Sequence, residues 1–351
     1  MRIAPDYSIQ NKRVFRWLMT GCFLIVLMIV IGGITRLTQS GLSMVKWEPI
    51  MGTLPPLSAE AWNGVFELYK QSPEFAHYNA HFTLSDFKAI YFWEYLHRLI
   101  ARILGLIFIV PCIVFWVKGY FNPRLKKQVI LIFIFGLLQG VLGWVMVKSG
   151  LVDQPHVSHY RLAAHLITAL GLLLYIFWVA IGLKYVILSN SNVLIRKYSR
   201  FFIFLVFLQI CFGAFVAGLK AGFIYNTFPK MGGKWIPKQF GTILHRDGIM
   251  NLFEDHGIVQ FIHRVIAFVL LGTLILILVK VRKQSLAVIQ KTTLTGLVGI
   301  LLIQITLGII TLVYSVPIFF GVMHQFVAIL VLLFSVFFLF TLTQSKTKIS
   351  T

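Results

Sequence analysis

The chain of 351 residues contains few charged residues and few cysteines. Charged residues make up 12% of it, about half the share found in soluble domains, so the composition excludes a mostly soluble protein. Three cysteines are present, and each lies within an apolar run rather than in a polar loop: Cys22, Cys112 and Cys211. We therefore expect no structural disulfide and interpret the three thiols as packing residues.

Acidic residues are also scarce, at 11 against 32 Lys and Arg, which gives a net charge of +21. Such an excess can indicate nucleic-acid binding, but its distribution does not fit that class. The basic residues gather at the N-terminus and in the segments that follow every second apolar run, and Asp6 is the only acid in these segments. By the positive-inside rule these segments are cytoplasmic, so both termini are predicted to be inside. Membrane lipid, not nucleic acid, is the expected partner.

Eight apolar runs of roughly 20 residues are long enough to cross about 30 Å of hydrocarbon. The first lacks a small-residue cleavage site, so we expect a retained span rather than a secretory signal. The sequence predicts an all-α polytopic membrane protein, in a bacterial cytoplasmic (inner) membrane rather than a mitochondrial inner membrane. The predicted spans are 14–35, 91–117, 128–148, 160–187, 200–220, 257–281, 291–313 and 317–343.

The two halves of the chain repeat one another. Gln139–Gly143 in the third run matches Gln304–Gly308 in the seventh, and four spans per half give both halves the same orientation. We predict two tandem four-helix bundles related as a parallel internal repeat, with halves 1–190 and 191–351. The outer loop after the first span of each half is rich in aromatic residues, Pro and Gly, so we expect ordered caps there.

Four histidines occupy matched positions inside apolar runs: His97, His165, His263 and His324. Histidine is costly in a bilayer core, and an intramembrane His is a candidate functional residue. Paired imidazoles on facing helices can hold a haem iron from both faces, so the duplication predicts two haem sites. The alternative is that these are core histidines bonded to carbonyl groups, which the duplication and the matched depth disfavour.

The remaining six histidines fall in outer loops or at their edges: His77, His81, His156, His159, His245 and His256. His156 and His159 could bind a metal ion, but we interpret them as residues of a solvated loop.

Basic residues lie beside the four candidate ligands. Arg98 and Arg264 directly follow a histidine, and Arg36 ends the first span on the outer side. Haem propionates are anionic, so these three arginines are candidate propionate partners. Lys148 and Lys220 also end spans on that side, and we interpret them as interfacial anchors.

The halves differ next to one histidine. Glu94 stands one helical turn before His97, whereas its counterpart before His263 is the neutral Gln260. A carboxylate beside a buried site can move protons or stabilise a cation, so the first half is predicted to be catalytic. The second half would then hold a resident electron-transfer haem. The alternative is that Glu94 only pairs with Arg98 at the membrane edge.

The histidine pattern alone leaves three classes open. A membrane enzyme acting on haem is one, and a di-haem b-type cytochrome transferring electrons from quinol is the second. A haem exporter or carrier is the third. Glu94 opposite Gln260 favours the enzyme, because a cytochrome needs no such carboxylate.

Over about residues 14–340 the chain resembles the haem A synthase family, through motifs whose order and spacing are specific together. They are Gly33–Met44, Trp47–Pro49, Gly52–Pro56, Phe87–Lys88, Glu94–Arg98, Gly143–Gly150, Tyr160–Leu166, Gly218–Gly222, Asn226–Met231, Gln260–Arg264 and His324–Gln325. The lack of cysteine pairs in the outer loops is typical of the cysteine-free branch shared by alphaproteobacteria and mitochondria.

The resemblance implies a function for each half. His263 and His324 would ligate a haem b cofactor, while His97 and His165 would flank a haem O substrate, with Glu94 as the essential acid. The implied reaction oxidises the C8 methyl of haem O to a formyl group, giving haem A for terminal oxidases. Haem O synthase and cytochrome oxidase assembly factors are the implied partners. Whether the chain forms a homo-oligomer is left open.

Overall fold

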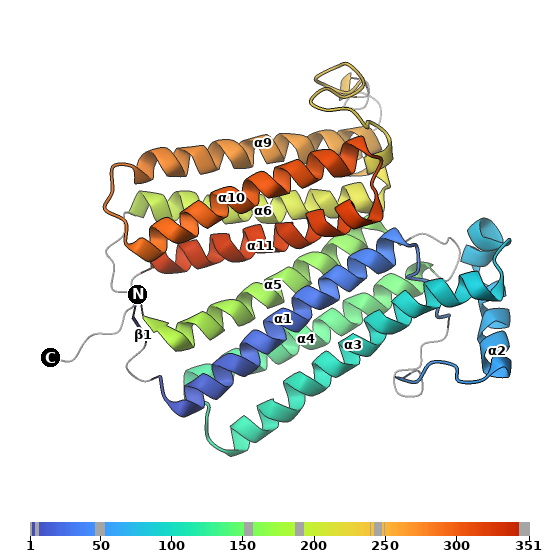
Figure 1. Cartoon of the computed structure of the whole chain (residues 1–351), viewed down its shortest axis with the longest axis horizontal. Coiled ribbons are helices and arrows are strands. Elements are labelled where there is room, and N and C mark those ends of the chain that lie inside the picture. The colour runs from blue at the N-terminus through green and yellow to red at the C-terminus, as the bar shows by residue number, and fades with distance from the viewer. Residues whose placement is uncertain are drawn as a thin grey trace.

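Eight long helices dominate the computed structural model, which describes residues 2–3, 7–45, 53–150, 157–186, 193–238, 240–241, 248 and 250–343 (Figure 1). Each is long and apolar enough to cross a membrane, which confirms the predicted all-α fold with eight spans. They are α1 (Ile9–Leu37), α3 (Leu84–Val117), α4 (Pro123–Gly150), α5 (His159–Lys184), α6 (Val193–Gly218), α9 (His256–Val281), α10 (Val288–Val313) and α11 (Ile318–Leu342).

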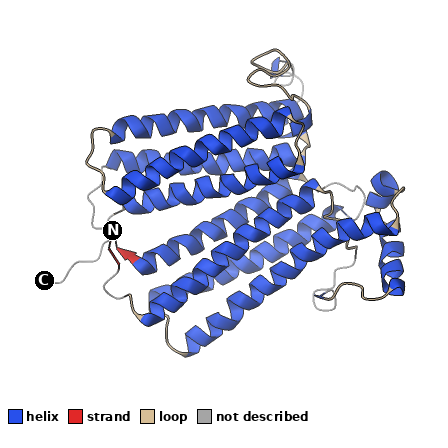
Figure 2. Ribbon diagram, viewed as in Figure 1, coloured by secondary structure: helices blue, strands red, loops and turns tan. Residues whose placement is uncertain are grey.

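The remaining described elements are short. Strands β1 (Arg2–Ile3) and β2 (Tyr185–Val186) pair antiparallel, with Arg2 opposite Val186 (Figure 2). Outside the spans lie α2 (Ala59–Lys70), a π-helical turn η2 (Phe75–Asn79), a 3-10 turn η3 (Ala221–Phe223) and α8 (Asn251–Glu254). The first outer loop is therefore partly helical, as expected of an ordered cap, although Trp47, Pro49 and Gly52 lie outside the described residues.

Helix α3 begins seven residues earlier than the sequence pattern predicted. Thr83 caps it: the Thr83 hydroxyl accepts from the backbone N–H of Asp86, and the Asp86 carboxylate accepts from the backbone N–H of Thr83. This reciprocal pair satisfies two N–H groups that would otherwise lack a partner at the start of the helix. The extra turns carry α3 beyond the apolar run, where Phe87 and Tyr91 pack into the cap.

The helices pack in the same pattern in both halves. In the first half α1 packs against α3 and α5, and α4 packs against α5. In the second half α6 packs against α9 and α11, and α10 packs against α11. Contacts between the halves join α1 to α11 and α5 to α6, so α1, α5, α6 and α11 form the centre and the other four spans lie outside them (Figure 1).

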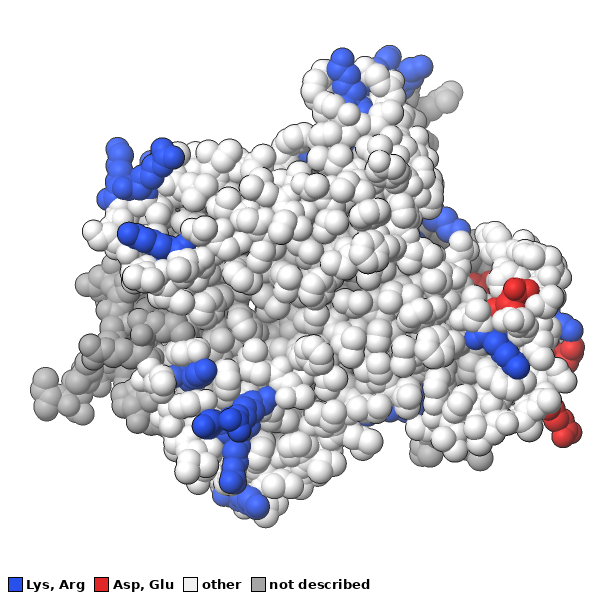
Figure 3. Space-filling model, viewed as in Figure 1, with Lys and Arg blue, Asp and Glu red and all other residues white. Residues whose placement is uncertain are grey.

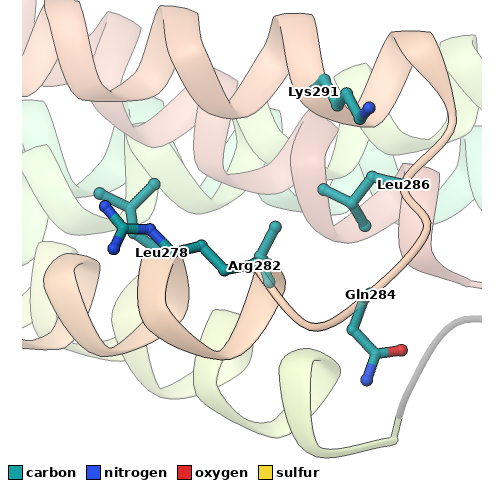
Figure 4. A pocket seen from close by; sticks show the side chains of 6 residues that line it. Leu278, Arg282, Gln284, Leu286 and Lys291 are labelled. Carbon is teal, nitrogen blue, oxygen red and sulfur yellow. The ribbon is translucent and has the colours of Figure 1, made fainter.

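Charge separates along the length of the spans. On the face shown in Figure 3 the acidic residues appear only at the end where α2 lies. At the opposite end, the coloured charged residues on this face are all Lys or Arg. A pocket of about 330 Å³ at that opposite end follows the turn between α9 and α10, with Arg282 and Lys291 in its lining (Figure 4). Gln284 and three apolar side chains complete the lining, so this pocket combines basic, polar and apolar groups.

Candidate functional site

Each of the two candidate haem ligands of the first half, His97 and His165, lies against a glycine of a neighbouring helix. A Cβ atom added to Gly32 of α1 would lie 3.1 Å from Cε1 of His97 on α3. One added to Gly143 of α4 would lie 3.1 Å from Cε1 of His165 on α5. These distances are tighter than ordinary contacts, so glycine is what allows the imidazole rings to approach the neighbouring backbone.

The second half repeats this geometry. A Cβ atom on Gly213 of α6 would lie 3.2 Å from Cε1 of His263 on α9, and one on Gly308 of α10 would lie 2.8 Å from Cε1 of His324 on α11. All four predicted histidines therefore have the same setting, in which the ring edge lies on a glycine of the adjacent span.

A glutamine stands one turn before three of these four glycines and contacts the histidine ring. The Nε2 atom of Gln139 lies 3.0 Å from Nδ1 of His165, and that of Gln209 lies 3.2 Å from Nε2 of His263. In the sequence Gln139 served only as a marker of the repeat, and Gln209 was not among the predicted site residues. The signal was present, because Gln209 precedes Gly213 by the same four residues.

His324 shows the most complete arrangement. The Nε2 amide of Gln304 lies 3.4 Å from Nε2 of His324, and Nδ1 of His324 lies 3.2 Å from the carbonyl oxygen of Gln304. An amide N–H donates and a carbonyl accepts, so the tautomer that satisfies both contacts carries its proton on Nδ1. This tautomer, with Nδ1–H held by a carbonyl, is the form in which histidine ligates a metal through Nε2, and a metal at Nε2 would take the place of the Gln304 amide.

His97 differs from the other three histidines. Met28 occupies the position that glutamine holds elsewhere, four residues before Gly32. Within the described part of the chain, Nδ1 of His97 is buried and has no hydrogen-bond partner. The ring is placed by its contact with Gly32 rather than by a polar group.

Glu94 is buried and forms the ion pair with Arg98 that the sequence analysis kept as an alternative. Its Oε1 accepts from Nη2 of Arg98 at 2.6 Å. Its Oε2 accepts from the Ser43 hydroxyl at 2.7 Å and from the Met44 backbone N–H at 2.8 Å. Arg98 also donates to the Met44 carbonyl at 3.1 Å. Glu94 and Arg98 thus attach the segment that follows α1, at Ser43 and Met44, to helix α3.

Gln260 and Arg264 make the matching connection in the second half, with opposite polarity. Gln260 donates from Nε2 to the carbonyl oxygen of Ala221 at 3.1 Å, and Arg264 donates to the carbonyl oxygens of Tyr225 and Thr227 at 2.8 and 2.9 Å. The loop after α6 offers acceptors here, where the loop after α1 offers donors. A carboxylate suits the first loop and an amide suits the second.

The predicted propionate partners differ in how far they are engaged. The guanidinium groups of Arg98 and Arg264 bind the loops described above. Arg36, in the last turn of α1, has no side-chain partner among the described residues. Lys148 and Lys220 contact aromatic rings, with Nζ 4.9 Å from the centre of the Trp144 ring and 5.7 Å from that of Tyr78.

The interpretation of His159 as a solvated loop residue is wrong. It is the first residue of α5, and only 5% of its surface is exposed because it packs against Gly218 of α6 and the Phe215 ring. Its Nε2 lies 3.9 Å from Oε2 of Glu254. His77 and His81 are exposed, as expected, while His156 and His245 lie outside the described residues. The described residues include no group of three or more His, Cys, Asp or Glu placed to hold a metal ion.

The two halves are also joined next to the candidate ligands. Gln325, which follows His324, donates from Nε2 to the carbonyl oxygen of Ile29 on α1 at 2.7 Å. Its Oε1 lies 2.5 Å from where a Cβ atom of Gly33 would be. Gly33 is adjacent to Gly32, so this contact connects the surroundings of His324 with those of His97.

Comparison with known proteins agrees with this arrangement. Residues 15–336 match a family model, COX15-CtaA, that is described as cytochrome oxidase assembly protein. The chain belongs to this family. It is 44% identical to a heme A synthase of Flavobacterium psychrophilum over 92% of this chain and 96% of that protein. It is 42% identical to heme A synthases of Nitrosospira multiformis, with 92% and 91% covered, and of Rickettsia bellii, with 92% and 96% covered.

The residues present in this COX15-CtaA family member fit the binding of haem. Four imidazoles lie inside spans, each against a glycine, and the tautomer at His324 carries its proton on Nδ1. Arg36, at the end of α1, offers a cation that has no partner among the residues described. Haem ligation needs a neutral imidazole with one nitrogen held by a hydrogen bond and the other available. His324 meets the first condition through Nδ1, and its Nε2 becomes available when the Gln304 amide moves away.

Proposed function

We propose that this chain is a haem A synthase, a membrane oxidoreductase that converts the C8 methyl of haem O to a formyl group. The family match over most of the chain carries the proposal, and the four intramembrane histidines agree with it. A di-haem b-type cytochrome remains the second candidate, because the same four histidines would serve it.

The second half is proposed to hold a haem b cofactor between His263 and His324. In support, Gln209 and Gln304 hold these two rings, and both rings lie against glycines. When bound, the cofactor would supply one-electron transfer. The chain's own contribution is to fix both imidazoles in neutral form and to exclude water by burying them among apolar spans.

The first half is proposed to hold haem O between His97 and His165. Glu94 lies one helical turn from His97, and Arg36 is the most available propionate partner, ahead of the engaged Arg98. Converting a methyl to a formyl group is a four-electron oxidation that removes two hydrogens from carbon and adds one oxygen atom, and its oxidant and oxygen atom come from outside the chain. The Glu94 carboxylate can accept one of the protons released. Arg98, Ser43 and the Met44 backbone hold that carboxylate in place and stabilise its charge.

Both termini are proposed to lie in the cytoplasm, with the candidate ligands in the outer half of the membrane. The basic end of the molecule, away from α2, supports this orientation (Figure 3). The matching helix contacts of the two halves support a parallel duplication at about residue 190. The basic and apolar pocket between α9 and α10 would then face an anionic lipid headgroup. Haem O synthase and oxidase assembly factors are the proposed partners.

Labelling of single cysteines tests the orientation. Ser58 before α2 and Ser285 between α9 and α10 are both exposed, whereas the native thiols lie within spans. An impermeant maleimide added to intact cells should label Ser58→Cys and not Ser285→Cys. The reverse pattern would contradict the orientation.

Analysis of extracted haem tests the function. The chain should be expressed in cells that make haem O, then purified, and its haem resolved into haem B, haem O and haem A. Haem B together with haem O or haem A is the expected result. Haem B as the only pigment, at two per chain, would favour the di-haem cytochrome and contradict the enzyme.

A further inference from the structure

Met28 departs from a pattern that the other three candidate histidines share, in which a glutamine stands four residues before the glycine that contacts the ring. Of the four glycines that contact a histidine ring, Gly143, Gly213 and Gly308 follow a glutamine by four residues. The fourth, Gly32, follows Met28 by the same spacing. Helices α1 and α6 hold equivalent positions in the two packing patterns, so Met28 stands where Gln209 stands in the second half.

Met28 in place of a glutamine changes which hydrogen bond a haem iron would have to displace when it binds each histidine of the first half. Gln139 lies 3.0 Å from Nδ1 and 3.3 Å from Nε2 of His165, so either ring nitrogen is within reach of its amide. Met28 has no N–H to donate. Among the described residues the His97 ring has no hydrogen bond, and its buried Nδ1 has no partner. Nδ1 of His263 is also without a partner, but that ring keeps its contact with Gln209 through Nε2.

The difference favours one order of iron binding in the first half. Ligation by His165 through Nε2 needs the proton on Nδ1, and a protonated Nδ1 cannot accept from the Gln139 amide N–H. Loss of that hydrogen bond weakens binding by about 2- to 10-fold in an equilibrium constant. Ligation by His97 breaks no such bond. Nδ1 of His97 has no partner among the described residues, so iron bound through Nε2 displaces no hydrogen bond of this ring.

We propose that Met28 makes His97 the ligand that captures the substrate porphyrin iron first, and that His165 completes the axial pair after Gln139 has moved. This inference rests on the proposed substrate site between His97 and His165. Met28 acts through His97 and is a positioning residue. The consequence is that the incoming porphyrin is first held at α3, on the helix that carries Glu94.

The test is a titration of the purified full-length protein, with haem b in its second half, by ferric haem B. Two backgrounds each retain one ligand: His165→Ala keeps His97, and His97→Ala keeps His165. We expect His165→Ala to bind the added haem about 2- to 10-fold more tightly than His97→Ala. The low-spin spectrum of the resident haem reports in every variant whether the protein is folded.

Met28→Gln and Gln139→Met are expected to shift the affinity for added haem in opposite directions. In the His165→Ala background, Met28→Gln should weaken binding about 2- to 10-fold, and Met28→Leu, which is apolar like methionine, should not. In the His97→Ala background, Gln139→Met should strengthen binding by a similar factor. Equal affinities of the two single-ligand variants, or no effect of Met28→Gln, would overturn the order of capture. Failure of the unmodified protein to bind added haem in a way that depends on His97 and His165 would overturn the proposed substrate site instead.

Discussion

Gln325 on α11 donates a 2.7 Å hydrogen bond to the carbonyl oxygen of Ile29 on α1, and it does so across the boundary between the two halves. Its neighbour His324 is a candidate ligand of the second half, and Ile29 lies one turn before the glycine that supports His97 in the first. The equivalent position beside His165 holds Leu166, which cannot make this bond. On the α5 side the polar contacts with the second half lie instead at the start of the helix, where Tyr160 donates to Glu254 at 2.7 Å and His159 lies 3.9 Å from it.

Gly33→Ala should disrupt this connection. The added methyl would meet Oε1 of Gln325 at 2.5 Å and force the side chain off the α1 backbone. Loss of a buried hydrogen bond with its partner left unsatisfied costs about 1–3 kcal/mol, so we expect a lower thermal unfolding midpoint in detergent. Gly21→Ala on the same helix is the matched control, because a methyl there meets nothing within 4 Å. Equal midpoints for the two variants would show that the Gln325 contact adds no stability.

Gly308→Ala should reduce the haem b content of the second half. The methyl would lie 2.8 Å from Cε1 of His324 and push the ring away from its contacts with Gln304. Absorbance of the low-spin haem per mole of purified protein measures the effect. Gly299→Ala on the same helix has open space and should retain full haem. His263→Ala and His324→Ala should each abolish the low-spin spectrum, and a normal spectrum from either would refute its assignment as a ligand.

Glu94→Gln should stop turnover while leaving the second half intact. The change removes the charge that Arg98, Ser43 and Met44 surround, and loss of a general base typically costs on the order of 10²–10⁴ in rate. Haem O or a partly oxidised intermediate should accumulate in extracts while the haem b spectrum persists. A normal yield of haem A would mean that Glu94 serves only to attach the loop to α3.

Gln260→Glu should damage the second half rather than create a second catalytic site. The amide donates to the carbonyl oxygen of Ala221, and a carboxylate there would face an acceptor without an N–H to offer. We expect destabilisation of about 1–3 kcal/mol, read as a lower unfolding midpoint and a weaker haem b spectrum. Gain of activity in this variant, or rescue of Glu94→Gln by it, would contradict the assignment of catalysis to the first half.

The cap over the first half should loosen as the pH rises through about 7. Burial raises the pKa of Glu74 to about 7; the Tyr69 hydroxyl bond opposes this shift, and the charge of Glu94 adds to it. A carboxyl group whose pKa is raised by folding favours the folded state below its unfolded pKa, near 4, and that stability is lost as the pH passes the folded value. Amide hydrogen exchange in α2 and η2 should therefore be faster at pH 8 than at pH 6, after correction for intrinsic rates.

Glu74→Gln should remove this dependence on pH, because the amide keeps a hydrogen-bonding oxygen but does not ionise. Glu67→Gln is the control, since the Glu67 side chain is 65% exposed and should leave the dependence unchanged. Identical exchange profiles for the unmodified protein and Glu74→Gln across this pH range would show that the cap does not respond to Glu74.

The spans and the four histidines were predictable because each has a local signal. Hydrophobic runs mark the spans, and a histidine inside such a run is conspicuous. The partners of Glu94 were not predictable in the same way, because Ser43 and Met44 lie about 50 residues away and are brought to it by the path of the chain after α1. The early start of α3 could have been read from Thr83 and Asp86, which form a capping box before the apolar run.

The sequence also suggested a solvated loop at His159, and here the tertiary structure overrides the local signal. A polar segment precedes the residue, yet Gly218 on another helix leaves room for it to be buried. The polarity difference between Glu94 and Gln260 was visible in the sequence, but its fit to donors in one loop and acceptors in the other depends on backbone directions that no local pattern encodes.

The contact between Gln325 and Ile29 also constrains how the protein is made. The two residues are 296 positions apart, so α1 leaves the ribosome first but receives this partner only with the last span. Strand β1 likewise waits for β2, roughly 180 residues later, before Arg2 can pair with Val186. The glycines beside His97 therefore reach their final surroundings late in biogenesis, after the helices of the second half have entered the membrane. A nascent chain arrested before α11 would carry every residue of the first site without the helix that positions α1.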